Sequence, residues 1–190
     1  MAHIDLGPAA ARLGDLVTSV RDDQLGLPTP CPKYALGDLL DHVGGLALGF
    51  TLAAAKTTAE GGPSGDAARL SAAWREEIPA ALAGMAEAWR DPSAWDGMTA
   101  LGPFELPGEV AGLVGLDELV VHGWDVARSL RVGYEARSDE LEVLLPHVAG
   151  FTGPRDPDGM FGPIVEVPEG AAGLDRLVGL CGRDPGWTSP

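Results

Sequence analysis

Apolar residues recur at intervals of three and four along most of this chain. The spacing is clear over residues 5–25, from Leu36 to about Ala59, from about Asp66 to Arg90 and from about Ser138 to Ala149. Such spacing places apolar side chains on one face of a helix. Each stretch is therefore predicted to be an amphipathic helix, with Asp66 and Ser138 as N-caps.

Glycine and proline separate these stretches. Three prolines between Leu27 and Tyr34 exclude a helix interior or a central strand, so we expect an extended connector there. Residues 60–65 predict a loop, and residues 91–107 an irregular stretch with a short hairpin around 95–104. Pro79, inside the third predicted helix, should kink or interrupt it.

The last 40 residues are less regular. Residues 150–170 are rich in glycine, proline and aspartate, which predicts a loop with one strand-like burst at Ile164–Val167. A short helix is expected near Ala171–Cys181, followed by a polar tail.

A further helix, over about 108–131, is apolar or small at almost every position. Such a helix must lie inside a bundle. Glu118 and His122 break the pattern, and their spacing of four directs both side chains to one place. Because a buried carboxylate without a partner is costly, either the two side chains bond each other or a divalent metal binds both. Glu-x-x-x-His is common by chance, so this stretch alone leaves both interpretations open.

The same helical face continues through small and polar residues. It comprises Ala111, Gly115, Glu118, His122, Asp125 and Ser129. The small residues predict open space, so we expect Gly115 to border a pocket, one turn from Glu118. Asp125 is expected either to orient the His122 imidazole or to pair with Arg128.

The second predicted helix has a similar face. His42 shares it with Asp38, Gly45 and Gly49. A single histidine on a helix is more often a core or surface residue than a ligand, but two internal helices with matching faces favour a shared site. We therefore predict that His42, Glu118 and His122 bind one metal and that Gly45 borders the pocket. His3 and His147 lack a paired ligand, so we expect neither in the site.

Two nitrogens and one oxygen from three side chains suit a catalytic metal. Three protein ligands leave a coordination position for water or substrate, and zinc is the expected ion, although nickel and iron also suit this donor set. Cys31 and Cys181 have no Cys-x-x-Cys spacing and are expected to be small buried residues. We expect Trp124 in the core, and Arg75, Arg128 and Arg131 in salt bridges or in solvent rather than on an anionic ligand.

Composition and charge limit the partners. With 190 residues and 45% hydrophobic residues, the chain can bury a full core as a single domain, 1–190. A formal charge of −15 and a pI near 4.4 argue against nucleic acid or an anionic membrane, which require a basic surface. The sequence has no membrane-spanning apolar run and no signal-peptide pattern, so we expect a cytoplasmic protein. It leaves open whether the chain forms a homodimer.

Three segments in order resemble a known family. Thr29-Pro-Cys-Pro32, Leu36-Gly-Asp-Leu-Leu-Asp-His42 and Asp117-Glu-Leu-Val-Val-His-Gly-Trp-Asp-Val-Ala127 are similar to the metal-binding domain of mycothiol-dependent maleylpyruvate isomerases, in the DinB-like superfamily. Phe161–Pro168 and Gly182–Pro185 resemble a small subgroup of that family. The resemblance spans nearly the whole chain.

The resemblance implies an all-α fold, a DinB-like four-helix bundle with one crossover, here with a short C-terminal extension. It also implies a divalent metal at His42, Glu118 and His122, and a thiol cofactor such as mycothiol or bacillithiol. The isomerases also have a second, carboxy-terminal domain, and 190 residues leave no room for it here.

The first functional hypothesis is a metal-dependent, thiol-using S-transferase or isomerase that acts on a small electrophile. A metal would lower the pKa of a bound thiol and polarise a substrate carbonyl. The alternatives are a metal-dependent hydrolase, and a metal-containing binding or stress-response module without turnover.

Overall fold

The computed structural model describes residues 3–57, 64–155 and 161–189. Within them the chain is mostly helical, consistent with the predicted all-α DinB-like fold, and it also has one two-stranded antiparallel hairpin. In chain order the elements are α1 (Gly7–Ser19), η1 (Asp22–Gln24), α2 (Leu36–Ala54), η2 (Ala67–Arg69), α3 (Trp74–Ala88), α4 (Pro92–Trp95), β1 (Met98–Leu101), β2 (Phe104–Pro107), α5 (Gly108–Leu130), α6 (Ser138–Ala149) and α7 (Gly173–Leu180).

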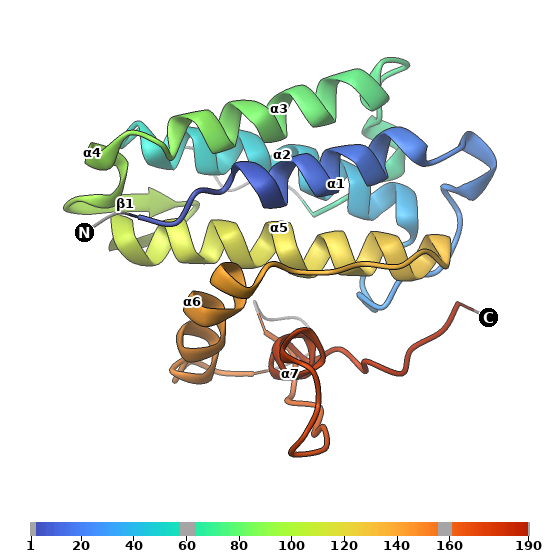
Figure 1. Cartoon of the computed structure of the whole chain (residues 1–190). Coiled ribbons are helices and arrows are strands. Elements are labelled where there is room, and N and C mark those ends of the chain that lie inside the picture. Colours follow the sequence, from blue (N-terminus) through green and yellow to red (C-terminus); the bar gives the residue numbers. More distant parts are fainter. Residues whose placement is uncertain (1–2, 58–63, 156–160, 190) are drawn as a thin grey trace.

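The core is enclosed by helices α1, α2, α3 and α5, which lie side by side (Figure 1). Helix α1 packs on α3 and α5, and α2 packs on the same two helices. Helices α2 and α3 run in the same direction, whereas α1 and α5 run in the opposite one (Figure 1). The described residues just before α3 lie beside the first turns of α2, where the Ala67 amide donates to Asp38, so α2 and α3 start at the same end of the molecule.

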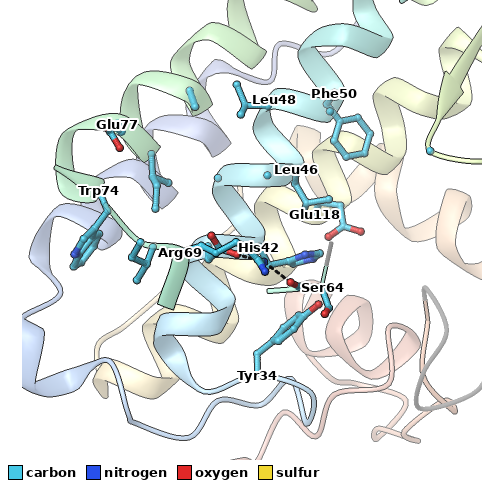
Figure 2. Close-up of a pocket in the computed structure, with 18 of the residues that line it drawn as sticks. Tyr34, His42, Leu46, Leu48, Phe50, Ser64, Arg69, Trp74, Glu77 and Glu118 are labelled. Carbon is cyan, nitrogen blue, oxygen red and sulfur yellow. Dashed lines mark hydrogen bonds and ion pairs between the residues drawn. The ribbon is translucent and has the colours of Figure 1, made fainter. Parts of the chain in front are cut away.

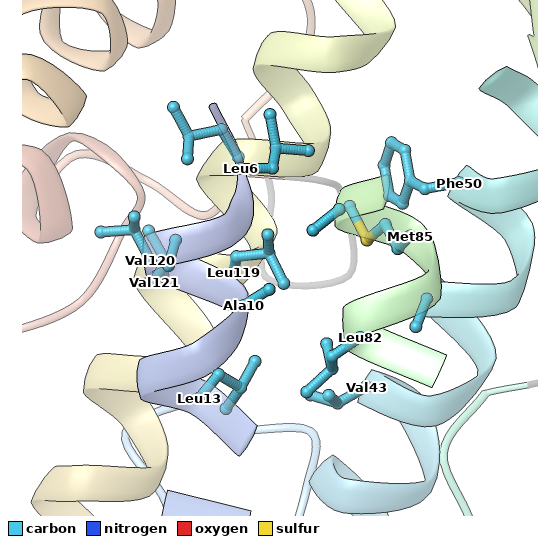
Figure 3. Packing of buried hydrophobic residues seen from close by; sticks show 14 of the residues in the cluster. Leu6, Ala10, Leu13, Val43, Phe50, Leu82, Met85, Leu119, Val120 and Val121 are labelled. Carbon is cyan, nitrogen blue, oxygen red and sulfur yellow. The ribbon is translucent and has the colours of Figure 1, made fainter. Parts of the chain in front are cut away.

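The core lies between these four helices. Figure 3 shows Leu13 of α1, Val43 of α2, Leu82 of α3 and Leu119 of α5 directed into the same space. Each is at most 3% exposed. Their positions follow the three-and-four spacing of the sequence, because that spacing gives each helix one apolar face.

Helix α5 is buried on most of its surface, as predicted for an internal helix. The side of α5 that faces away from α1 and α2 is covered by the C-terminal part of the chain, which comprises α6, α7 and residues 181–189 (Figure 1). Arg128 and Arg131 donate hydrogen bonds to the carbonyls of Pro185 and Ser189. The final segment therefore lies along α5. None of the described helices has the length and apolar character of a membrane span.

Several helix boundaries differ from the predictions. The first predicted helix ends early because Val20 is extended and its carbonyl accepts a hydrogen bond from Arg75 Nε at 2.8 Å. Helix α2 ends at Ala54, two residues before Lys56 takes a left-handed φ of 57°. Its predicted end near Ala59 lies outside the described residues.

The third predicted helix is divided in two. Asp66 caps η2, accepting a hydrogen bond from the Ala68 amide, and α3 begins only at Trp74. Helix α3 is continuous through Pro79, so Pro79 does not interrupt the helix, and the alternative of a kink stays a prediction. The ring lies against α1, where an added Cβ on Gly14 would be 3.4 Å from the Pro79 Cβ.

The remaining predictions are mostly confirmed. The hairpin is formed by β1 and β2, although Trp95 belongs to α4. Helix α6 has the predicted bounds, but Ser138 is its first residue and Arg137 occupies the cap position. Ile164–Val167 forms no strand in the described chain; the Val165 amide instead donates to the Gly179 carbonyl.

Candidate metal centre

Helices α2 and α5 bring three potential metal ligands together. One ligand atom each of His42, Glu118 and His122 lies within 4.8 Å of the other two. The rings of His42 and His122 meet edge to face, with centroids 5.2 Å apart. Ligand atoms around one tetrahedral zinc are about 3.4 Å apart, so small side-chain shifts would close this arrangement on an ion.

His122 lies between two carboxylates. Its Nε2 is 2.9 Å from Glu118 Oε2, and its Nδ1 is 2.9 Å from Asp125 Oδ2. Asp125 is fully buried and its Oδ2 also accepts a hydrogen bond from Arg183 at 3.2 Å. Asp125 thus orients the imidazole, and its partner is Arg183 rather than Arg128.

The two histidines differ in protonation state at pH 7. Burial, and then the neighbouring His122, lower the pKa of His42 to about 4, so its imidazole is neutral at pH 7. Burial also lowers the pKa of His122, but the hydrogen bonds to Asp125 and Glu118 outweigh it and raise the pKa to about 10. A metal binding at Nε2 would replace that proton, while the other ring nitrogen keeps its hydrogen bond to Asp125.

His42 has an environment that fits a ligand. It contacts the Tyr34 ring, with centroids 5.0 Å apart, and makes no hydrogen bond to any described residue. Gly65 packs against His42, since an added Cβ there would collide with the Asp38 carbonyl and lie 3.1 Å from the His42 Cβ. Asp38 accepts a hydrogen bond from the Ala67 amide at 2.8 Å, which holds this segment on α2. A neutral imidazole with unused nitrogens fits the proposed donor set.

A cavity of about 600 Å³ leads from the ligands between α2 and α3 to the hairpin. Figure 2 shows His42 and Glu118 at one end, with Tyr34 beside them, and Leu48 and Phe50 farther along α2. Two charged residues of its wall, Asp41 and Arg69, form an ion pair at 2.5 Å. The site therefore has room for an organic ligand beside the candidate metal.

The two glycines predicted to border the pocket differ. Gly45 lines the cavity, and an added Cβ would meet nothing within 4 Å. Gly115 does not line it, since an added Cβ would lie 2.9 Å from Met85 Cε and 3.1 Å from Phe50 Cδ1. The prediction for Gly115 is wrong, because the face of α5 turns toward the packed core at this position.

Arg183, Tyr34 and Arg69 also lie at the site, and the sequence does not predict them. Arg183 is 58 residues from Asp125 in the chain, so no local pattern connects them. Arg75 pairs with Asp22, as predicted, whereas Arg128 and Arg131 donate hydrogen bonds to the carbonyls of Pro185 and Ser189. None of the three lines the cavity. Cys31 and Cys181 are buried, as expected, and Cys181 Sγ is 3.6 Å from Asp117 Oδ1.

Residues 6–127, which contain all three candidate ligands, match the mycothiol maleylpyruvate isomerase N-terminal domain. The chain belongs to this family. It is also 30% identical over 188 residues to two proteins of Mycobacterium tuberculosis, the uncharacterized protein Rv0738 of strain H37Rv and the uncharacterized protein MT0763 of strain CDC 1551. The alignments cover 96% of this chain and 96% of each relative, so they extend well beyond residue 127 into the C-terminal part of the chain. No solved structure matches the chain.

Proposed function

We propose that the chain is a metal-dependent protein that uses a mycothiol-type thiol, as an S-transferase or isomerase acting on a small electrophile. The observation that carries this proposal is the meeting of His42, Glu118 and His122 at one end of a cavity, in a member of the mycothiol maleylpyruvate isomerase N-terminal domain family. Zinc is the proposed ion, since two imidazoles and one carboxylate form a common zinc donor set.

We also infer that this chain forms the four-helix bundle with one crossover that the family resemblance implies. Helices α1, α2, α3 and α5 would form the four-helix bundle, the connection between α2 and α3 its crossover, and residues after α5 an extension of the same single domain. The parallel directions of α2 and α3 support this inference (Figure 1).

The residues of the site would have different roles. His42, Glu118 and His122 would hold the ion, which supplies Lewis acidity that lowers the pKa of a bound thiol. Asp125 fixes the orientation of His122, and Arg183 neutralises the buried Asp125. In S-transfer, a carbon–sulfur bond forms as the leaving group departs with its electron pair and the thiol proton passes to water.

Cobalt substitution tests the proposal directly. The protein should hold about one divalent ion per chain by elemental analysis, and mycothiol added to the cobalt form should produce a sulfur-to-cobalt charge-transfer band. The double variant Cys31→Ser, Cys181→Ser is the control, because it removes the thiols of the chain itself. Failure to retain zinc, nickel or cobalt would refute the metal site. A metal without a thiol band would favour the hydrolase or the non-catalytic module.

A further inference from the structure

The cavity changes in character along its length. Its inner end carries the candidate ligands His42 and Glu118, whereas its outer end, toward the hairpin, is apolar. The apolar wall comprises Leu48, Phe50, Leu101, Phe104 and Val114. Gly45 and Gly49 form part of the wall on α2, and a Cβ at either position would meet nothing within 4 Å. The space between these walls is therefore open to a ligand.

Two large side chains of the apolar end are exposed. Leu48 is 62% exposed and Phe104 64%, and they come from different elements, α2 and β2. An apolar group lying between them would remove surface of both from water, which favours its binding.

The charges around the cavity disfavour an anion. Within the described residues, Arg69 is the one cation of the wall, and it already pairs with Asp41 and donates to the Ser64 carbonyl. Glu77 and Glu118 add further carboxylates. Apart from the proposed metal at the inner end, a dicarboxylate would meet like charges along the wall and one cation that is already neutralised.

We propose that the electrophile of this site is an uncharged molecule with an apolar tail, its reactive end at His42 and Glu118 and its tail between Leu48 and Phe104. The electrophilic end of this molecule rests on the proposed function, whereas its apolar tail rests on the cavity wall alone. An uncharged substrate with such a tail belongs to a different chemical class from a small dicarboxylate.

A homologous series of ligands tests the tail. Linear alcohols from 1-butanol to 1-decanol are titrated into the full chain by calorimetry, with maleate as the dianion. Affinity should rise about fourfold per methylene, which corresponds to ~0.8 kcal/mol, until the tail fills the cavity. Affinity independent of chain length, or maleate binding at least as tightly as 1-octanol, would overturn the proposal.

A matched pair of variants locates the tail. Gly49→Leu places a side chain in the cavity, whereas Ala11→Leu adds the same side chain on an exposed position of α1, from which no described residue lines the cavity. Gly49→Leu should weaken 1-octanol binding by about tenfold, a loss of ~1.4 kcal/mol, and Ala11→Leu should leave it unchanged. Thermal unfolding verifies that both variants fold, and equal binding by both would place the alcohol elsewhere and overturn the proposal.

Chelator-treated protein separates this proposal from the metal function. The chain-length dependence should persist without metal, because the apolar wall needs none. If the protein proves metal-free and the dependence holds, the proposed function fails and the apolar site stands. If metal and thiol bind but the dependence is absent, the tail proposal alone fails.

Discussion

His42 is the residue on which the candidate centre depends. Glu118 and His122 lie one turn apart on α5 and bond each other without help, but His42 comes from α2 and has no other polar partner among the described residues. Glu118 and His122 alone would form an ordinary hydrogen-bonded pair. His42 adds the third ligand atom, which makes the arrangement typical of a metal site.

The His42→Ala variant should therefore lose tight zinc binding while the fold is retained, because the half-buried imidazole contributes a ligand and little core packing. His147→Ala is the matched control, since His147 lies on α6 outside the cluster. Elemental analysis and thermal unfolding of both variants test this. A His42→Ala protein with a full metal content would contradict the assignment.

Glycine-to-alanine changes at Gly45 and Gly115 should have opposite effects on stability. Gly45→Ala should add roughly 0.5–1 kcal/mol, because alanine favours a helix and the new methyl meets open space. Gly115→Ala should lose stability, because its methyl presses on Met85 and Phe50, and overpacking typically costs ~1–3 kcal/mol. Chemical denaturation measures both, and stabilisation by Gly115→Ala would show that the core has space there.

At the scale of elements, the segment after α7 supplies contact partners for polar side chains of helix α5. Asp117, Asp125, Arg128 and Arg131 of α5 or its end contact Cys181, Arg183, Pro185 and Ser189 in the same order. Each of these polar side chains of α5 thereby has at least one partner away from water. One of these contacts, between Asp125 and Arg183, continues to His122.

Arg183→Met should reduce zinc affinity by about 10-fold or more, because Asp125 loses the charge that balances it and orients His122 less firmly. Arg128→Met is the control: Arg128 also anchors the final segment to α5 but does not contact Asp125. Competition with a zinc-binding dye gives both affinities, and the cobalt spectrum reports the ligand geometry. Equal losses in the two variants would indicate a structural role only.

Helix α6 is held to α1 by a largely buried ion pair. Glu140 is 1% exposed; it accepts from Arg12 at 2.5 Å and from the Arg137 amide at 2.8 Å. Glu140→Ala should cost about 3 kcal/mol, at the low end for a broken buried pair because Arg12 is partly exposed. Glu142→Ala, at an exposed position of α6, should change little in denaturant unfolding. A similar loss in both would contradict this role.

At the scale of the whole molecule, the candidate ligands connect α2 and α5, and His42 and Glu118 are more than 70 residues apart in sequence. Zinc that binds only the folded chain should therefore stabilise it, by ~2.7 kcal/mol at a free concentration 100 times the Kd. Thermal unfolding with zinc and with chelator measures this. The His42→Ala variant should show no such shift, and an identical shift in that variant would mean that zinc binds elsewhere.

The sequence determined the parts of the molecule that depend on local spacing. Helices α5 and α6 follow their predicted ranges within one residue, because their apolar pattern is long and their ends carry breakers. The pairing of Glu118 with His122 is equally local, since four residues on one helix fix it. His42 was found because its face resembled that of the pair.

Tertiary structure alone decided which side of each helix meets which neighbour. Gly115 and Gly45 look alike in sequence, but one is packed against Phe50 and the other borders the cavity, because the rotation of each helix is set by the whole core. Arg183 reaches Asp125 across 58 residues, and the break before α3 depends on contacts of η2 with α2. Such contacts carry no period along the chain, so only the folded molecule reveals them.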